Sequence, residues 1–407
     1  MRILIVSQYY WPEHFRINDL AEGLVERGHH VTVLTGCPNY PGGDIFNGYG
    51  FFNKSEIQNG VKIFRVPLIP RGTGSSIRLA MNYLSFMVTA TLLGPFLCRG
   101  SIDLIFVCQL SPVTVGIPAA FLKRLKGAPI VFWVLDLWPE SIATSKGLNN
   151  TWLYKAINFL VCYIYRQCDR ILYTSKGFAL SIQSRGVDPS KLSYFPNWVE
   201  AQPNPHTENL APLPNGFRVM FAGNIGESQD FGMILAAAEL LKTHANIQWI
   251  ILGEGRQWAW VKEQVEKRGL GNCFHLLGRF PADSMSGFFK QADALLVTLK
   301  KEPAFSMTVP GKVPSYMSCG KPILAALDGE GASLIREANA GFVVPSGDSQ
   351  ALAESVMKMS LLPLEERIQM GLSAQQFCNK HFDREFLFTN LEILMGDVVQ
   401  TSHSVSH

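Results

Sequence analysis

The sequence has no paired cysteines. Its eight cysteines are scattered, none lies in a CxxC pair, and none has a histidine partner at the spacing of a zinc site. Most stand inside apolar runs, as reduced and buried thiols do. This pattern argues against a disulfide-stabilised secreted domain and favours a reducing compartment. The opening stretch, MRILIVSQYYWPE, is too short for a signal peptide and has no cleavage site, so we interpret it as the first strand of a cytoplasmic protein.

Clusters of charge are also missing. Only 17% of the residues are charged, the formal net charge is +3, and no run of Lys or Arg occurs. This composition argues against a nucleic-acid partner. There is no D-x-D pair, and a metal that bridges phosphates normally requires such carboxylates, so we expect neither a metal nor a resident cofactor. The absence of G-x-G-x-x-G argues against a dehydrogenase.

Apolar residues are abundant, at 47% of the chain, and they gather in short runs between longer amphipathic stretches. Such runs are typical of buried parallel strands, and their alternation with helices predicts βα units. The runs form two series, at residues 3–7, 31–35, 63–66, 104–108, 130–134 and 170–174, and at residues 218–222, 248–252, 273–277, 294–298, 322–326 and 341–344.

A polar, proline-bearing stretch at residues 200–216 separates the two series and is typical of a linker. A chain of 407 residues is long enough for two cores. We therefore predict an α/β fold with two doubly wound, parallel-sheet domains facing a cleft, at residues 1–200 and 201–380. Residues 381–407 are expected to form one amphipathic helix, followed by a disordered SHSVSH tail.

The apolar segment at residues 79–98 is long enough to cross a bilayer, although polar residues and a proline dilute it. It fits a buried helix of the first domain. It also fits an interfacial helix that rests on anionic lipid, flanked by Arg71, Arg78 and Arg99. A true membrane span is the least favoured reading, because the strand series continues on both sides.

The most informative stretch is residues 310–331, PGKVPSYMSCGKPILAALDGEG. A strand at 322–326 ends in the turn formed by Asp328, Gly329, Glu330 and Gly331. Glycines at the end of a buried strand leave backbone N–H groups free at the start of the next helix, where an anion binds. Lys312 adds a fixed cation close by in the sequence. Together these features indicate a site for a nucleotide diphosphate.

Several segments, in this order and spacing, resemble the GT-B glycosyltransferases of the large retaining family 4. The resemblance covers nearly the whole chain, including the segment just described. Within that family the chain is most similar to the bacterial O-antigen and capsule branch that contains the L-fucosamine transferases. The segments that carry the resemblance are YWPEHFRINDL after the first strand, LDLWPES at 135–141, FAGNIGESQ at 221–229 and residues 310–331.

The resemblance implies a retaining, metal-independent transfer of an amino-deoxy sugar such as N-acetyl-L-fucosamine. The donor would be a UDP-sugar and the acceptor a polyprenyl-pyrophosphate-linked sugar. The enzyme would lie on the inner face of the cytoplasmic membrane, with polysaccharide-assembly enzymes as possible partners. Two other functions stay open: a UDP-sugar 2-epimerase, which shares this architecture, and a non-catalytic nucleotide-sugar-binding protein.

The first domain is expected to hold the acceptor. Many relatives have a glycine pair in the loop after the first strand, where this chain has Glu13, His14 and Arg16. Arg16 and Arg71 would contact an anionic ligand, whereas Glu13 could instead cap the following helix. Asp136 replaces a histidine of many relatives. It either caps a helix, positions the acceptor hydroxyl or takes its proton.

The second domain departs from the family pattern at the donor phosphates. Relatives carry an arginine and a lysine in the loop after Gly223, where this chain has Asn224 and Gln229. Amides donate hydrogen bonds but bring no charge. Lys312 is therefore the candidate to stabilise the departing diphosphate.

The remaining candidates concern the nucleotide. Gly253 and Glu254 form a tight turn that borders the nucleotide in relatives, and the glycine is also explained by the turn alone. Arg279 would contact the base or pair with a carboxylate. Relatives also carry two glutamates eight positions apart, where this chain has Met307 and Ser315, so Ser315, Asp328 or Glu330 would contact the ribose.

Overall fold

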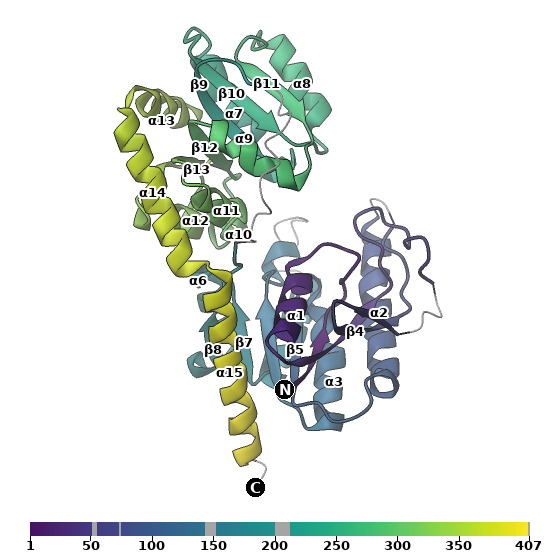
Figure 1. The fold of residues 1–407 in the computed structure, drawn as a ribbon. Coiled ribbons are helices and arrows are strands. Elements are labelled where there is room, and N and C mark those ends of the chain that lie inside the picture. The colour runs from purple at the N-terminus through teal and green to yellow at the C-terminus, as the bar shows by residue number, and fades with distance from the viewer. Residues whose placement is uncertain (51–54, 73–74, 143–151, 200–211, 406–407) are drawn as a thin grey trace. The chain divides into compact units, whose positions relative to one another are not determined.

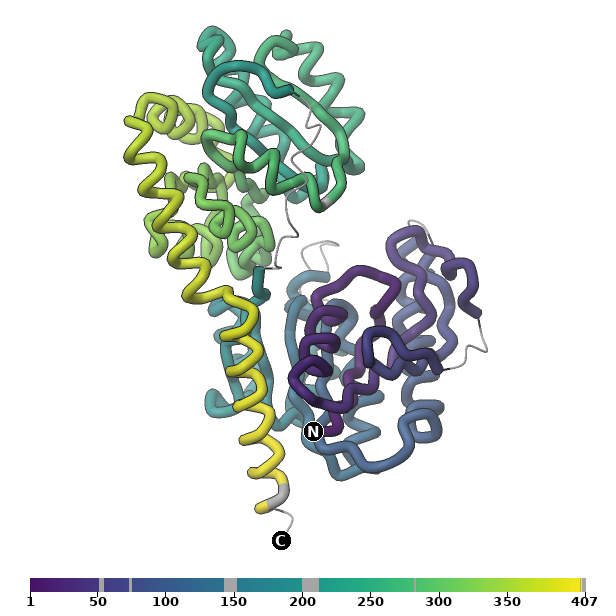
Figure 2. Tube along the Cα trace, viewed as in Figure 1, coloured from purple at the N-terminus to yellow at the C-terminus, as the bar shows by residue number. Residues whose placement is uncertain are grey.

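The computed structural model of the protein describes residues 1–50, 55–72, 75–142, 152–199 and 212–405. The chain divides into two compact units (Figures 1 and 2). Unit 1 comprises Met1–Asn197 together with Glu385–His407, and unit 2 comprises Trp198–Arg384. Most of the linker predicted at 200–216 lies outside the described residues.

Unit 1 contains an eight-stranded sheet in the order β3-β4-β2-β1-β5-β6-β7-β8. All neighbours pair in parallel except β3 and β4. Apart from Gln109, the central strands β5 and β6 consist of apolar residues, and they are buried on both faces, as expected for a parallel sheet covered by helices. The strands are β1 (Arg2–Val6), β2 (His30–Gly36), β3 (Glu56–Gln58), β4 (Val61–Val66), β5 (Leu104–Gln109), β6 (Ile130–Val134), β7 (Arg170–Tyr173) and β8 (Leu192–Tyr194).

The helices of unit 1 include the one predicted at 79–98, but this helix is not buried in the domain as the first of our interpretations expected. The helix α2 buries only every fourth residue, namely Asn82, Phe86, Ala90 and Gly94. The reading as a buried helix is therefore wrong, because only one narrow stripe is fully buried and the other residues of α2 are half-buried or exposed. The unit's helices are α1 (Arg16–Glu26), α2 (Ser76–Leu97), α3 (Gly116–Lys126), α5 (Trp152–Gln167), α6 (Lys176–Gln183) and α15 (Arg384–Val405).

The last helix, α15, drawn in yellow in Figure 1, returns the chain from unit 2 to unit 1. Arg27 binds Glu385 and Glu392 at 2.5 Å each, and His29 contacts Glu392 at 2.7 Å. Phe388 is fully buried beneath these ion pairs. The helix continues to Val405, so the prediction of a disordered tail is wrong for residues 402–405. The residues of this segment belong to unit 1 rather than forming a separate part.

Unit 2 contains a six-stranded parallel sheet in the order β11-β10-β9-β12-β13-β14. Alternate residues of each strand enter two separate cores, for example Val219 and Phe221 on one face and Met220 and Ala222 on the other. Both faces are therefore covered, as in a doubly wound fold. The strands are β9 (Phe217–Ala222), β10 (Ile247–Leu252), β11 (Phe274–Gly278), β12 (Ala294–Thr298), β13 (Ile323–Ala326) and β14 (Gly341–Val344).

The order of these strands creates a switch point beside β9. The chain moves from β9 to β10 on one side, whereas β12 lies on the other side of β9. Ligands of open α/β sheets bind at such points, outside the carboxyl ends of the strands. The helices of unit 2 are α7 (Phe231–Leu240), α8 (Trp258–Lys267), α9 (Met285–Gln291), α10 (Pro303–Ser306), α11 (Lys312–Ser318), α12 (Gly329–Glu337), α13 (Ser349–Leu361) and α14 (Leu364–His381).

Candidate functional site

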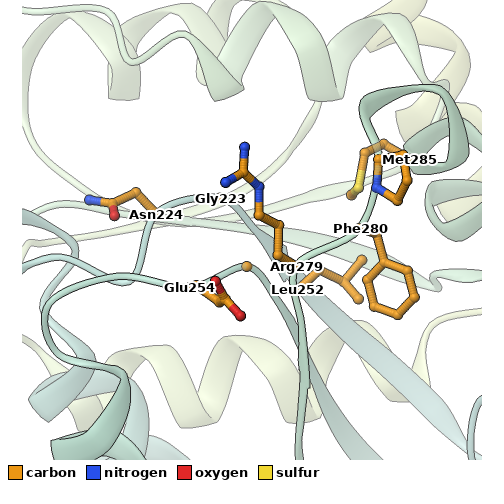
Figure 3. A pocket seen from close by; sticks show the side chains of 9 residues that line it. Gly223, Asn224, Leu252, Glu254, Arg279, Phe280 and Met285 are labelled. Carbon is orange, nitrogen blue, oxygen red and sulfur yellow. The ribbon is translucent and has the colours of Figure 1, made fainter. Parts of the chain in front are cut away.

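A pocket of 860 Å³ lies at the carboxyl ends of β9, β10 and β11 in unit 2 (Figure 3). It brings together five residues that the sequence predicted for nucleotide-sugar binding: Gly223, Asn224, Gly253, Glu254 and Arg279. Four further lining residues were not predicted: Leu252, Phe280, Pro281 and Met285. The pocket combines apolar walls with a few polar groups, the usual make-up of a small-molecule site.

Two glycines let the backbones at the strand ends approach each other. Gly253 has φ +132°, and a Cβ atom there would lie 1.9 Å from the carbonyl oxygen of Gly223. The Gly223 N–H donates to the Leu252 carbonyl at 2.8 Å, and the Gly253 N–H donates to the Gly278 carbonyl at 2.7 Å. The parallel hydrogen bonding therefore continues beyond the strands and forms a rigid floor for the pocket.

Lys312 lies beside this floor. Its Nζ donates to Gln229 Oε1 at 2.6 Å and stands 3.6 Å from the centroid of the Phe221 ring. A Cβ atom added to Gly223 would lie 3.2 Å from the same nitrogen. Although Lys312 and Gln229 are far apart in sequence, the structure places them together at the switch point.

The electrostatics of this amine favour an anionic ligand. Burial lowers the pKa of Lys312 to about 7, because little solvent stabilises the ammonium ion. Its hydrogen-bond acceptor is a neutral amide, which does not compensate the charge. A bound diphosphate would supply that compensation and would raise the pKa again.

Lys312 and Gln229 are not among the residues that line the pocket, and neither are five other predicted residues. The glycines at the start of α12 have a packing role: a Cβ atom at Gly329 would lie 1.8 Å from the Ser306 carbonyl oxygen, and one at Gly331 would lie 2.9 Å from Pro310. The other three are Ser315, Asp328 and Glu330. Their assignment to the nucleotide, like that of the two glycines, stays a prediction.

In unit 1, Glu13 has a different environment from the one expected of an acceptor contact. It is 3% exposed, and its Oε1 accepts the backbone N–H groups of Asn39 and Tyr40 at 2.7 Å each. The N-cap of α1 is Phe15, so the reading of Glu13 as a helix cap is wrong. Burial raises the pKa of Glu13 to about 7, although these hydrogen bonds oppose the shift. Glu13 therefore fastens two loops together.

The basic candidates of unit 1 lie near that loop pair. Arg16 is the first residue of α1, and His14 is exposed just before it. Arg71 places its guanidinium 4.9 Å from the Tyr40 ring, and its backbone N–H donates to Asn39 Oδ1 at 3.1 Å. These residues follow the carboxyl ends of β1 and β4, where a ligand of this sheet is expected.

Asp136 follows the carboxyl end of β6. Its Oδ2 accepts the indole N–H of Trp138 at 2.9 Å, and Gln109 Nε2 donates to its backbone carbonyl at 2.6 Å. Burial raises the pKa of Asp136, and hydrogen bonds from Trp138, Ser141 and Ser111 oppose that rise. The carboxylate is thus held in one position by side-chain donors. Trp138 belongs to the motif LDLWPES, but the sequence of the motif alone did not predict its hydrogen bond to Asp136.

Metal ligands do not cluster in the part of the chain that the structure describes. No group of three or more His, Cys, Asp or Glu side chains gathers there in a way that could hold an ion. Two cations lie at this pocket: Arg279 lines it, and the amine of Lys312 lies beside Gly223 at its floor.

Two family models match the chain, one in each unit. The model for the glycosyl transferase 4-like domain matches residues 14–198, and the model for glycosyl transferases group 1 matches residues 216–360. WcaI of Escherichia coli (strain K12), named for a glycosyl transferase step in colanic acid biosynthesis, is 24% identical over 339 residues. The alignment covers 79% of this chain and 82% of WcaI.

Solved structures show the same fold at low identity. Anabaena HepE in complex with UDP and glucose matches with a TM-score of 0.66 and 16% identity, covering 97% of this chain and 99% of HepE. Sucrose-phosphate synthase from Thermosynechococcus elongatus matches with a TM-score of 0.76 and 14% identity, covering 98% and 99% of the two chains. The predicted architecture of two parallel-sheet domains is confirmed, and its neighbours have the GT-B fold.

Proposed function

We propose that the protein transfers a sugar from a UDP-sugar to a lipid-pyrophosphate-linked sugar during synthesis of a surface polysaccharide. The matches of residues 14–198 to the glycosyl transferase 4-like domain and of residues 216–360 to glycosyl transferases group 1 support a sugar transfer. The observation that carries this proposal is the pairing of Lys312 with Gln229 beside Gly223, a glycine that lines the unit 2 pocket. WcaI, named for colanic acid biosynthesis, supports the polysaccharide role, and the UDP bound to HepE supports the donor.

The donor would bind in unit 2. Its diphosphate would lie over the glycines at the ends of β9 and β10 and replace Gln229 as the partner of Lys312. Its nucleoside would extend toward Arg279 and Phe280. In the transfer step the bond between the sugar C1 and the phosphate oxygen breaks, and a bond from C1 to the acceptor oxygen forms. Lys312 and backbone N–H groups would stabilise the departing UDP, with no metal required.

The acceptor would bind in unit 1 near Asp136. Its hydroxyl would donate to the carboxylate, which is already oriented by Trp138. The hydroxyl proton passes either to Asp136 or to an oxygen of the departing phosphate. In the second case Asp136 positions the acceptor without changing its own protonation. The sugar would be transferred with retention, and N-acetyl-L-fucosamine is the donor sugar to test first.

The enzyme would work at the inner face of the cytoplasmic membrane. Among the described residues, α2 is the one helix that is long and apolar enough to cross a bilayer, and 22% of its apolar window is buried in the protein. Its exposed side chains include Ile77, Leu92 and Phe96, which are 74%, 62% and 68% exposed. A helix of this kind, held by a buried stripe, would lie on the lipid surface rather than cross it.

A donor screen tests the proposal. UDP-sugars are incubated with a lipid-pyrophosphate-linked GlcNAc acceptor, and the product is identified by mass. We expect transfer from one UDP-sugar, with Lys312→Ala reducing kcat about 100-fold. The matched control is Lys300→Ala, since Lys300 lies in the same unit but pairs with Glu227. Conversion of the UDP-sugar to an isomer in the absence of an acceptor would indicate an epimerase. Binding of a UDP-sugar without any turnover would indicate a non-catalytic nucleotide-sugar-binding protein.

A further inference from the structure

Unit 1 contains a second pocket, of 470 Å³, between α2 and α5. Leu79 and Leu84 line it from α2, and Leu153, Ile157 and Leu160 line it from α5. These walls are almost entirely apolar. A sugar or a nucleotide would leave its hydroxyl groups without partners against such walls, so they favour a hydrocarbon ligand.

One end of this pocket is polar. Asp136 lies there with Ser111 and Ser141. Thr114 also lines this end, is only 7% exposed, and its hydroxyl makes no hydrogen bond within the described part of the chain. A buried hydroxyl without a partner costs free energy unless a ligand or water satisfies it. The pocket therefore suits an amphiphile, with a hydroxyl-bearing group at Asp136 and a chain along the helices.

The outer surfaces of α2 and α5, which line the pocket, and of α3, which contacts both, match an anionic bilayer. The helices α2, α3 and α5 contain no aspartate or glutamate. They present large exposed apolar side chains, such as Phe121, Trp152 and Phe159, at 41%, 80% and 74% exposure. Their cations are Arg78, Lys123, Arg124, Lys126, Lys155 and Arg166, of which Lys123 pairs with Asp169. Apolar groups flanked by cations alone are typical of a surface that rests on anionic lipid.

We propose that the α2–α5 pocket binds the part of the acceptor's own hydrocarbon chain that lies next to its phosphate. This inference rests on the proposed function and names the feature by which unit 1 distinguishes a lipid-linked sugar from a free one. The chain would leave the bilayer along the exposed side of α2 and α5. Its phosphates would meet Arg78, in the first turn of α2 beside the lining residues Ser76 and Leu79, and Arg71, in the loop before that helix, and its sugar would reach Asp136 and Thr114.

The test compares acceptors that share one pyrophosphoryl sugar and differ only in chain length, two carbons against eleven, below the micelle concentration and without vesicles. Each buried methylene is worth about fourfold in affinity. We therefore expect kcat/KM for the longer chain to exceed that for the shorter one by at least tenfold. Equal kcat/KM values would overturn the inference while leaving the proposed function intact.

Matched variants locate the effect. Ala80 lines the pocket, and Met81, its neighbour on α2, is 42% exposed and does not line it. Ala80→Trp should abolish the chain-length preference, measured as the ratio of kcat/KM for the long and short acceptors, whereas Met81→Trp should keep it. Leu84→Asn, which makes the wall polar, provides a second variant. Equal loss of the preference in both tryptophan variants would assign the chain to the outer face of α2 and overturn the inference.

A binding measurement separates this inference from the proposed function. Farnesyl diphosphate and isopentenyl diphosphate are titrated calorimetrically into the whole protein and into Ala80→Trp. We expect the longer probe to bind at least tenfold more tightly, and only to the unmodified pocket. If this preference holds while no sugar is transferred to any acceptor, the proposed function is wrong and the pocket assignment stands. If the two probes bind equally, the pocket assignment is wrong.

Discussion

At the scale of single residues, the placement of one positive charge distinguishes this chain. The loop after β9 has Asn224 and Gln229 where the family resemblance led us to expect cations, and Lys312 arrives at the same point from α11. Since the Lys312 Nζ and the Gln229 Oε1 lie 2.6 Å apart, the charge stands within a few ångströms of the expected place although it comes from another element. An electrostatic role depends on the position of the charge and not on the residue number that supplies it.

This argument predicts the result of exchanging the two residues. Lys312→Gln alone should weaken UDP binding about 10- to 100-fold, because a charge-assisted hydrogen bond is lost. The double variant Lys312→Gln with Gln229→Lys should recover at least tenfold of that loss. Calorimetric titration with UDP measures both effects. A double variant that binds UDP no better than Lys312→Gln would show that the amine must come from α11.

The raised pKa of Glu13 predicts that the stability of the folded protein depends on pH. The pKa of Glu13 is about 7 in the folded protein and 4.5 in the unfolded chain, so between these values the folded state keeps a proton that the unfolded state has released. The stabilisation from that proton is complete below pH 4.5 and is lost as the pH rises through 7. Glu13→Gln is neutral throughout, and its Oε1 still accepts the N–H groups of Asn39 and Tyr40.

We therefore expect the Tm of the wild type to fall relative to that of Glu13→Gln between pH 5 and 8. The full effect corresponds to about 3 kcal/mol. Thermal unfolding across this range measures it, with Glu26→Gln, an exposed position on α1, as the control. Parallel pH profiles for the wild type and Glu13→Gln would contradict the assigned pKa.

At the scale of elements, contacts between strand ends shape the unit 2 pocket. Because the Gly253 Cα hydrogens face the Gly223 carbonyl, Gly253→Ala should introduce a clash as well as a strained φ. We expect a loss of about 3 kcal/mol or more. Gly271→Ala is the control, since a Cβ there meets nothing within 4 Å. Hydrogen exchange of β9 and β10 should rise only in Gly253→Ala, and protection equal to that of the wild type would contradict the role of this contact.

The elements also show what the sequence could predict. All twelve predicted strands overlap strands in the structure. Short runs of apolar, β-branched residues favour buried parallel strands in a doubly wound fold. The edge strands β3 and β8, of three residues each, escaped prediction since they carry no apolar run. Composition could not show that α2 buries only one stripe, because the same apolar residues suit a core or a lipid surface.

The same limit applies to the candidate site. Glycines at a strand end predict a close approach but not its partner. At Gly253 the partner is a neighbouring strand end that lines a pocket, whereas at Gly329 it is the carbonyl of Ser306. The burial of Glu13 was likewise invisible, because it depends on a loop that arrives from residues 39 and 40. Local patterns predicted the elements, and the contacts between distant segments required the structure.

At the scale of the whole molecule, the net charge is small, but the charged residues are unevenly distributed among the helices. The chain has a formal charge of +3, yet α2, α3 and α5 carry cations without a single acidic residue. The same helices carry many of the large exposed apolar side chains of unit 1. Hydrophobic insertion and attraction to anionic headgroups would therefore act on one surface, where their contributions to membrane binding add.

This surface predicts binding to vesicles that contain anionic lipid, weakened by salt because part of the attraction is electrostatic. Burying Leu92 or Phe96 in the interface is worth about 1.5–3 kcal/mol each. The double variant Leu92→Asp with Phe96→Asp should therefore reduce the partition coefficient about 100-fold or more in a sedimentation assay. Ile393→Asp is the control, since Ile393 is 60% exposed on α15, away from these helices in the sequence. If the wild type, the double variant and Ile393→Asp bound anionic vesicles equally, the proposed attachment through α2 would be wrong. If the wild type bound neutral and anionic vesicles equally, only the proposed role of the cations would be wrong.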